Sequence, residues 1–225
     1  MTLQGKRIVI TGGAGALGLG VGACARALGA DTVLLDLAFP ADAPADGSLR
    51  LAVDLGDAEA TRACFARIGR VDALFNLAGG FTMGPRTWEV SDAEWAQMYR
   101  INVTTMQNAV RAAVPSMIEH GRGAIVNVGA LGALKGQGQM SAYCAAKSVV
   151  MRLTESLSAE LKHHGVNVNA VLPSMIDTPR NRADMPDADP SLWVSPQDLG
   201  NVICFLGSDA ARAIHGALVP VAGLS

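Results

Sequence analysis

The sequence predicts an α/β fold, a single doubly wound domain whose seven-stranded, mostly parallel sheet carries helices on both faces. Short β-branched runs alternate along the chain with helical stretches, the order typical of strand–helix–strand units. The strand segments are continuous apolar runs, as expected of parallel strands that are buried on both sides. With 225 residues and no linker, repeat or low-complexity run, the chain is expected to form one domain over residues 1–225.

The individual elements follow from apolar runs and from the residues that begin and end helices. Strands are expected at residues 7–10, 32–35, 49–53, 73–77, 124–128, 166–172 and 218–221. Helices are expected from a glycine-rich turn to about residue 29, at 57–68, from 91 onward, from 141 to about 164, and from 195 onward. Ser91 and Glu94 form a capping box, and Ser195 is an N-cap followed by Pro196. Pro115 is a site where the helix from Ser91 could kink.

Composition and charge exclude several classes of protein. Hydrophobic residues make up 50% of the chain, which excludes a disordered protein, and the net charge of −2 argues against a nucleic-acid or polybasic membrane binder. No apolar run reaches the roughly 18 residues that span a bilayer, and the first residues lack a signal-peptide core, so a cytoplasmic location is expected. No Cys-x-x-Cys pair is present, so we expect no metal site and reduced, buried thiols at Cys24, Cys64, Cys144 and Cys204.

A glycine-rich turn follows the first expected strand and begins a helix. Gly13, Gly15 and Gly18 fit the pattern G-x-G-x-x-G of the Rossmann fold. Glycines let the backbone approach a pyrophosphate, whose charge then meets the helix N-terminus. The alternative is a turn with no ligand. If the turn binds a dinucleotide, the expected contacts are Gly12, Ala14, Gly15, Ala16, Leu17 and Gly18.

Asp36 ends the second expected strand, 18 residues after Gly18. A carboxylate there can accept hydrogen bonds from the adenine-ribose hydroxyls and repels a 2′-phosphate. The next residue is Leu37 rather than a basic residue, and the loop over 37–48 contains no Lys or Arg. These residues favour NAD over NADP, although an aspartate that merely starts a polar loop is the alternative.

Tyr143 and Lys147 are separated by four residues near the start of an expected helix, so they lie on one helix face. A nearby ammonium favours the phenolate and is expected to lower the tyrosine pKa from its usual value of about 10. Tyr143 could then pass a proton to or from a substrate oxygen. An exposed Tyr and Lys on a helix surface is the alternative interpretation.

These motifs, together with Thr11-Gly12, Asp54, Asn76-Leu77-Ala78-Gly79 and Asn102, resemble the short-chain dehydrogenase/reductase family over nearly the whole chain. The resemblance implies that Lys147 holds the nicotinamide ribose and that Asn102 orients a water that relays protons to Lys147. It also implies subunit pairing through the helices from Ser91 and Ser141, as a homodimer or homotetramer.

The resemblance further implies cofactor contacts at other strand ends. Asp54 and Leu55 correspond to the pair beside adenine, and Ala78, Gly79 and Gly80 to the end of the fourth strand. The stretch that holds the carboxamide corresponds to Pro173, Ile176 and Thr178, with Ser174 in place of a glycine. Asp54 and Thr178 could equally be ordinary turn or helix caps.

Two departures from the family pattern bear on the substrate. Ala16 replaces the middle glycine of the turn, and Ala130 stands where the catalytic serine is expected, 13 residues before Tyr143. Both features resemble the dihydropteridine reductase branch, as does the stretch at about 177–194, which we interpret as a lid over the substrate. The alternative for that stretch is a loop anchored by Met185 and Trp193. Asn102, in contrast, is more typical of the general family.

The sequence therefore predicts an NAD(H)-dependent oxidoreductase that transfers hydride to or from a small carbonyl, alcohol or quinonoid, pterin-like substrate. Two alternatives stay open. One is an ordinary ketone or 3-ketoacyl reductase that works without the serine. The other is a catalytically weak NAD-binding sensor or partner protein, which Ala130 favours and which the intact Tyr143 and Lys147 disfavour.

Overall fold

The computed structural model describes residues 1–42 and 45–224, and it contains a seven-stranded sheet in which every strand pair is parallel. The strand order is β3-β2-β1-β4-β5-β6-β7. The strands are β1 (Arg7–Thr11), β2 (Asp31–Asp36), β3 (Leu49–Ala52), β4 (Ala73–Asn76), β5 (Gly123–Val128), β6 (Val166–Pro173) and β7 (Leu218–Val221). The predicted fold class is thus confirmed, with a sheet that is entirely parallel. Residues 43 and 44 of the predicted loop, and residue 225, lie outside the described residues.

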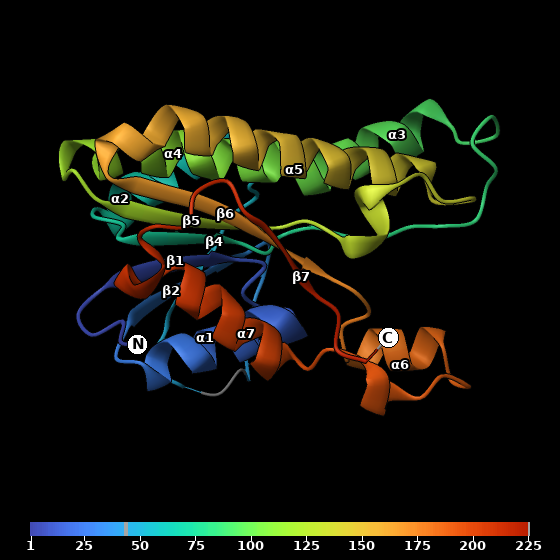
Figure 1. Ribbon diagram of the computed structural model, residues 1–225, viewed down its shortest axis with the longest axis horizontal. Coiled ribbons are helices and arrows are strands. Elements are labelled where there is room, and N and C mark those ends of the chain that lie inside the picture. Colours follow the sequence, from blue (N-terminus) through green and yellow to red (C-terminus); the bar gives the residue numbers. More distant parts are fainter. Residues whose placement is uncertain (43–44, 225) are drawn as a thin grey trace.

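Helices cover both faces of the sheet (Figure 1). One face is covered by α2 (Ala58–Ile68), α4 (Thr105–Glu119) and α5 (Ser141–Leu161), and the other by α1 (Ala16–Ala27) and α7 (Pro196–Leu206). The shorter helices are α3 (Asp92–Tyr99), which precedes α4, and α6 (Pro179–Asp184), which lies beyond the sheet near the C-terminal end. Along β1, Val9 packs under the first group of helices, while Ile8 and Ile10 pack under the second. This alternation within an all-apolar strand explains why no polar residue interrupts it.

The strand order reverses between β1 and β4, because the chain runs outward from β1 to β3 and then crosses back to the far side of β1. At this point the hydroxyl of Thr11 accepts hydrogen bonds from the backbone N–H groups of Leu77 and Ala78, both at 3.0 Å. The loops that leave the two strands diverge here, and such a switch point is where open parallel sheets bind ligands.

The helix predicted from Ser91 consists of three segments. Ser91 and Glu94 form the predicted capping box at the start of α3, and a π-helical segment over Arg100–Thr104 joins α3 to α4. The wider turn frees the carbonyl of Met98, which the side-chain amide of Asn102 takes over at 3.0 Å. The π segment was not predicted. Helix α4 continues through Pro115 to Glu119.

The cysteines, the apolar helices and the metal-ligating side chains bear on the remaining sequence predictions. All four cysteines are buried thiols with no disulfide, as predicted. None of the described helices is both long and apolar enough to cross a membrane. Within the described part of the chain, no group of three or more His, Cys, Asp or Glu side chains could hold a metal ion.

Candidate active site

A groove of about 650 Å³ lies at the carboxyl ends of the strands, where the strand order reverses. Twelve residues predicted to touch a dinucleotide line it: Gly12, Gly15, Ala16, Leu17, Gly18, Asp36, Leu37, Asp54, Leu55, Ala78, Gly79 and Thr178. Seven lining residues were not predicted: Val53, Leu77, Arg100, Ile101, Thr105, Pro179 and Arg180. The predicted residues that do not line this groove are Ala14, Gly80, Asn102, Tyr143, Lys147, Pro173 and Ile176. The groove is thus assembled from six separate chain segments.

The glycine-rich turn shapes one wall of the groove. A Cβ at Gly18 would lie 2.2 Å from the carbonyl oxygen of Gly12, so only glycine fits this position. A Cβ at Gly15, in contrast, would meet nothing closer than 3.4 Å, so this position has room for a side chain. The neighbouring Ala16 lines the groove. No side chain caps Gly15 at the start of α1, and the first turn of α1 has no acidic residue. The first N–H groups of the helix are therefore available to an anion.

Asp36 lies where β2 ends, beside the same turn. One carboxylate oxygen accepts the N–H of Ala14 at 2.9 Å, and the other accepts the N–H of Leu37 at 2.8 Å. These bonds fix the carboxylate at the groove while each oxygen keeps a lone pair. Asp36 is half-buried and lines the groove together with Leu37. Asp36 can therefore accept hydrogen bonds from vicinal hydroxyls.

Asp54 is held by a partner that the sequence does not reveal. Its carboxylate accepts a hydrogen bond from the guanidinium of Arg100 at 2.7 Å and one from the N–H of Gly56 at 2.8 Å. The hydrogen bond from Arg100 is the main reason why the pKa of Asp54 is lowered. Arg100 and Asp54 are 46 residues apart in the chain, so no local spacing pointed to this pair.

Helix α5 carries Lys147 beside Gly79, a lining residue of the groove, and Tyr143 lies one helical turn earlier. The ammonium of Lys147 donates to the carbonyl of Val128 at 2.9 Å, and its side chain is buried. This burial lowers the pKa of Lys147 to about 8. A Cβ on Gly79 would lie 3.3 Å from the Lys147 nitrogen and 2.6 Å from the Asn102 amide oxygen. Gly79 therefore lets strand β4 end between these two side chains.

Tyr143 differs from the sequence expectation. Burial raises the pKa of its phenol to about 12, although a lowered value was predicted from the nearby ammonium. Desolvation of the phenolate is the larger effect, because the ring packs among apolar side chains. One of these neighbours is Phe81, whose ring meets Tyr143 edge to face at a centroid distance of 4.9 Å. Tyr143 is thus a protonated hydroxyl in an apolar setting.

Asn102 is buried and bound on three sides. Its amide oxygen accepts the N–H of Gly80 at 3.2 Å, and its amide nitrogen donates to the carbonyls of Gly80 and Met98, both at 3.0 Å. The side chain thus ties the π segment to the end of β4. Gly79 lies between Asn102 and Lys147, since a Cβ on it would approach both side chains.

Ala130 follows β5 in extended backbone geometry. Its methyl group belongs to an apolar cluster with Ala133, Cys144 and Met151, against which Tyr143 also packs. This position therefore offers no hydrogen-bond donor to a substrate oxygen. The nearby Ser141 hydroxyl is buried and has no hydrogen-bond partner among the described residues.

The predicted carboxamide stretch leads from the end of β6 into α6. Thr178 caps α6 by accepting the N–H of Asn181 at 3.2 Å, as the cap interpretation anticipated, and it also lines the groove. Ile176 pairs with Val194 in an isolated bridge, which closes the segment between them into a loop. Pro173 ends β6. Thr178 thus serves as both a helix cap and a groove residue.

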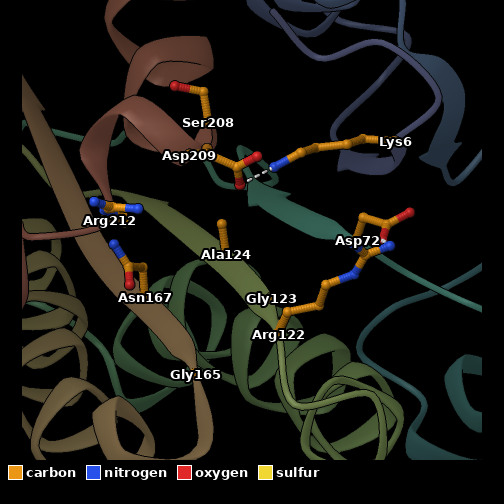
Figure 2. Close-up of a pocket in the computed structure, with 11 residues that line it drawn as sticks. Lys6, Asp72, Arg122, Gly123, Ala124, Gly165, Asn167, Ser208, Asp209 and Arg212 are labelled. Atoms are coloured by element: carbon orange, nitrogen blue, oxygen red, sulfur yellow. Dashed lines mark hydrogen bonds and ion pairs between the residues drawn. The ribbon is translucent and has the colours of Figure 1, made fainter.

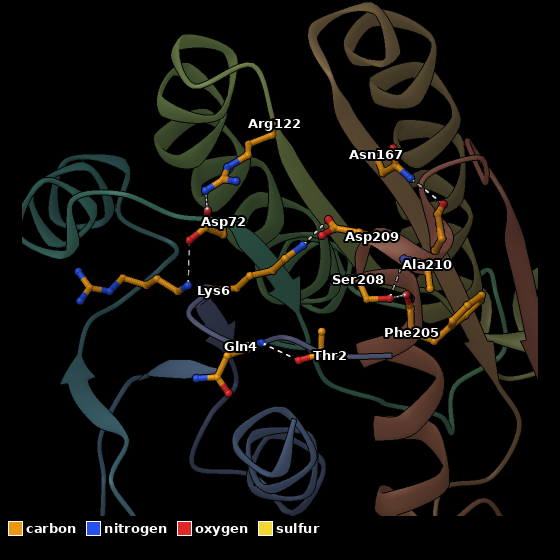
Figure 3. A network of polar contacts seen from close by, with 12 residues as sticks. Thr2, Gln4, Lys6, Asp72, Arg122, Asn167, Phe205, Ser208, Asp209 and Ala210 are labelled. Carbon is orange, nitrogen blue, oxygen red and sulfur yellow. Dashed lines mark hydrogen bonds and ion pairs between the residues drawn. The ribbon is translucent and has the colours of Figure 1, made fainter. Parts of the chain in front are cut away.

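A second, smaller cavity of about 80 Å³ lies at the amino ends of the strands, on the opposite edge of the sheet (Figure 2). Charged side chains surround it, including Lys6, Asp72, Arg122, Asp209 and Arg212. Ion pairs join Lys6 to Asp209 and Arg122 to Asp72 (Figure 3). None of the predicted site residues lines this cavity, so the candidate active site is the groove at the other edge.

Known proteins resemble this chain in sequence over almost its whole length. The family model described as short chain dehydrogenase matches residues 6–189. Galactitol 2-dehydrogenase of Rhizobium johnstonii is 34% identical, over 97% of this chain and 94% of its own. The 2-keto-3-deoxy-L-fuconate dehydrogenase of Xanthomonas campestris pv. campestris is 32% identical, over 95% of this chain and 78% of its own.

Solved structures agree with this family in fold. One described as a short chain dehydrogenase/reductase family protein has a TM-score of 0.91 at 32% identity, and covers 99% of this chain and 98% of its own. A putative NAD(P) dependent gluconate 5-dehydrogenase from Beutenbergia cavernae, with bound NADP at low occupancy, has a TM-score of 0.87 at 29% identity, and covers 99% of this chain and 97% of its own. The chain therefore belongs to the short-chain dehydrogenase/reductase family of NAD(P)-dependent oxidoreductases.

Proposed function

We propose that this enzyme prefers NAD(H) over NADP(H) and transfers a hydride to or from a small carbonyl, alcohol or quinonoid substrate. The observation that carries the proposal is that Lys147 and Asn102 both lie beside Gly79, which lines the groove together with Asp36, while Tyr143 lies one turn before Lys147 on α5. A tight glycine turn with uncapped helix N–H groups lines the same groove, which suits the diphosphate of a dinucleotide.

Each residue then has a defined part in the reaction. The nicotinamide supplies or accepts the hydride when it is bound. During reduction Tyr143 donates its phenolic proton to the substrate oxygen, and during oxidation it takes that proton back. Lys147 holds the nicotinamide ribose and, as an ammonium, stabilises negative charge on Tyr143. Asn102 orients a water that returns a proton to Lys147.

The substrate class has two candidates. Several relatives are named as dehydrogenases of polyols or sugars, including galactitol 2-dehydrogenase and the D-xylose 1-dehydrogenase of Caulobacter vibrioides, which is 29% identical. They support a secondary alcohol or ketone on a small polar molecule. Ala130 favours the second candidate, a quinonoid pterin, because a conjugated ring spreads the developing charge and depends less on a second donor.

The proposal also covers the substrate lid, the domain organisation, the subunit assembly and the cellular location. Residues 177–194, which include α6 and end in the bridge between Ile176 and Val194, form a lid over the substrate. The whole chain acts as one NAD-binding domain. The helices α3–α4 and α5 pair subunits into a homodimer or homotetramer, and the enzyme works in the cytoplasm. An inactive NAD-binding sensor is the alternative that turnover of any substrate excludes.

Replacement of Tyr143 by Phe tests the central step. The variant removes one hydroxyl, so NADH binding should stay nearly intact, while turnover should fall by about 10²-fold or more, the size typical of a lost general acid. Turnover is measured as NADH oxidation with a quinonoid pterin beside a panel of ketones and sugars. Lys147→Ala should weaken both binding and turnover. Unchanged turnover in Tyr143→Phe would place the proton transfer on another residue.

A further inference from the structure

Four charged residues line the groove among the described part of the chain, and they differ in their ion-pair partners. Its acidic residues are Asp36 and Asp54, and its cationic residues among the described part of the chain are Arg100 and Arg180. A dinucleotide brings two further negative charges on its diphosphate. Without a cation at the diphosphate, Asp36, whose carboxylate accepts only backbone N–H groups among the described residues, would oppose its binding.

Arg100 is already used within the protein. Its guanidinium bonds the Asp54 carboxylate at 2.7 Å, and this contact holds the pair at the adenine end of the groove. An arginine committed to a carboxylate adds little net charge to the groove. Arg180, in contrast, is the lining cation that no acidic residue of the groove pairs with among the described residues.

Arg180 is presented on the first turn of α6, and the base of this turn is fixed. The N–H of Asn181 bonds the Thr178 hydroxyl, and the guanidinium of Arg182 bonds both oxygens of the Asp177 carboxylate. The two arginines of α6 therefore differ. Arg182 fastens the helix to the preceding segment, whereas Arg180 lines the groove.

The side chain of Arg180 is only loosely paired. Its closest carboxylate oxygen among the described residues belongs to Asp184, at 3.6 Å, which is too long for a hydrogen bond. The side chain is 77% exposed, so the ion pair is worth little. The guanidinium can therefore exchange this partner for a better one at low cost.

The start of α1 lines the same groove. Ala16 and Leu17 lie there with N–H groups that no side chain caps, whereas the N–H of Gly15 donates to the carbonyl of Gly12 at 3.2 Å; α1 is 12 residues long. An anion on these N–H groups is attracted by the helix dipole, but it lacks a counter-charge on its other side. Arg180 lines the same groove from α6, two residues after Thr178.

We propose that Arg180 is a cofactor-binding residue that pairs with the diphosphate of the dinucleotide while the first N–H groups of α1 also bind it. This inference rests on the proposed function of the groove. Arginine suits the task because its planar fork makes two parallel hydrogen bonds to phosphate oxygens. The contact also joins α6, at the start of the substrate lid, to the bound cofactor, so that cofactor binding would order the lid before the substrate arrives.

The test compares ligands that share the adenosine group and differ in phosphate. Isothermal titration of the purified protein with NADH, ADP and adenosine gives three dissociation constants for each variant. In Arg180→Gln we expect NADH and ADP to bind about tenfold more weakly, which is ~1.4 kcal/mol, while adenosine binding is unchanged. Arg180→Lys should recover part of the loss, because the point charge remains but the fork does not.

Two controls separate the role of Arg180 from general effects of charge. Arg212→Gln removes an exposed guanidinium at the opposite edge of the sheet and should leave all three constants unchanged. Asp184→Asn removes the loose partner of Arg180 and should leave ADP binding equal or tighter.

The outcomes distinguish this proposal from the one on which it rests. If the wild-type protein binds NADH and Arg180→Gln binds ADP equally well, Arg180 does not bind the diphosphate. An equal loss of adenosine and ADP binding would also overturn the proposal, because it would indicate a general change in the groove. If the wild type binds no dinucleotide, the proposed function fails, and the role of Arg180 fails with it.

Discussion

Asp36 is the residue that most directly selects between the two nicotinamide cofactors. Its carboxylate is fixed by the N–H groups of Ala14 and Leu37 and cannot swing away from a 2′-phosphate. We expect wild-type kcat/KM to be much higher with NADH than with NADPH. Asp36→Ala should narrow that ratio by about tenfold or more, or ~1.4 kcal/mol, because the repulsion is removed.

Asp42→Ala is a matched control for this comparison, because it removes an exposed carboxylate from the same loop outside the groove. It should leave the cofactor ratio unchanged. Equal kcat/KM for the two cofactors in the wild type would show that Asp36 does not set the preference. Two similar solved structures contain bound NADP, so a preference of this chain for NADH would distinguish it from them.

Lys147 illustrates how a functional residue can lower stability. Burial lowers its pKa from 10.5 to about 8, so the charged amine lowers the free energy of unfolding at neutral pH. This shift corresponds to about 3 kcal/mol, of which the lost hydrogen bond to Val128 would offset about 1 kcal/mol. We therefore expect Lys147→Met to raise the free energy of unfolding by about 2 kcal/mol at pH 7, while it abolishes turnover.

The sign of the pH dependence follows from the direction of the shift. Below pH 8 the lysine is charged in both states and the penalty is complete, whereas between pH 8 and 10.5 only the unfolded state keeps the proton. The advantage of Lys147→Met should therefore shrink as the pH rises through this window. Urea unfolding of both proteins at pH 7 and pH 9.5 measures the difference. A variant that is less stable than wild type at pH 7 would contradict the argument.

At the scale of elements, we expect the segment from β5 into α5 to influence which carbonyl compounds are reduced. Ala130 places a methyl group in the apolar cluster against which Tyr143 packs, where a serine would offer a second donor. If the enzyme is a pterin-type reductase, Ala130→Ser should change its native activity little. Weak ketone reduction should rise by up to roughly 10²-fold, the lower range for one added donor at a developing oxyanion.

The other functional candidates give different results in the same experiment. In a ketone reductase handicapped by Ala130, the native activity itself should rise, and in a sensor neither activity should appear. Ala133→Ser, which adds a hydroxyl to the same buried cluster, is the matched control and should improve nothing. Large gains on the native substrate of the serine variant would overturn the pterin assignment.

The elements show which features a sequence can predict. Every expected strand and major helix is present, because buried apolar runs and local caps such as Ser91–Glu94 depend on neighbouring residues. The π segment at Asn102 was not predicted, since it depends on a side chain that bonds its own helix and the end of β4. Contacts between distant segments, such as Arg100 with Asp54, leave no periodic signal.

The chemistry of the site was predicted less completely than its position. The turn glycines, Asp36 and Thr178 meet at one groove because parallel strands end at the same edge of a sheet. The pKa of Tyr143 was predicted in the wrong direction, because spacing along a helix reveals the nearby lysine but not the burial that outweighs it. Burial depends on the packing of Phe81 and the apolar cluster, which only the fold determines.

Across the whole molecule, the amino and carboxyl ends of the strands carry two different sites. The carboxyl edge holds the groove, and the amino edge holds the charged cavity with its ion pairs (Figure 3). Asp72, at the start of β4, is central to the amino edge. Its carboxylate is 7% exposed, and it accepts hydrogen bonds from the N–H of Arg7 at 2.9 Å and from the guanidinium of Arg70 at 3.0 Å. It thereby joins the starts of β1 and β4.

This separation predicts that stability and activity can be changed independently. Asp72→Ala leaves the N–H of Arg7 without its acceptor and should lower the free energy of unfolding by about 1–3 kcal/mol. Asp209→Ala, in the same cavity, removes a carboxylate that is 88% exposed and that pairs, among the described residues, with Lys6 alone, so its effect should be about 0–1 kcal/mol. Because neither residue lines the groove, kcat/KM at 25 °C, far below unfolding, should stay at the wild-type value in both variants. Chemical unfolding and steady-state kinetics of the three proteins measure both quantities. A folded Asp72→Ala protein with greatly reduced kcat/KM would show that the two edges of the sheet are coupled.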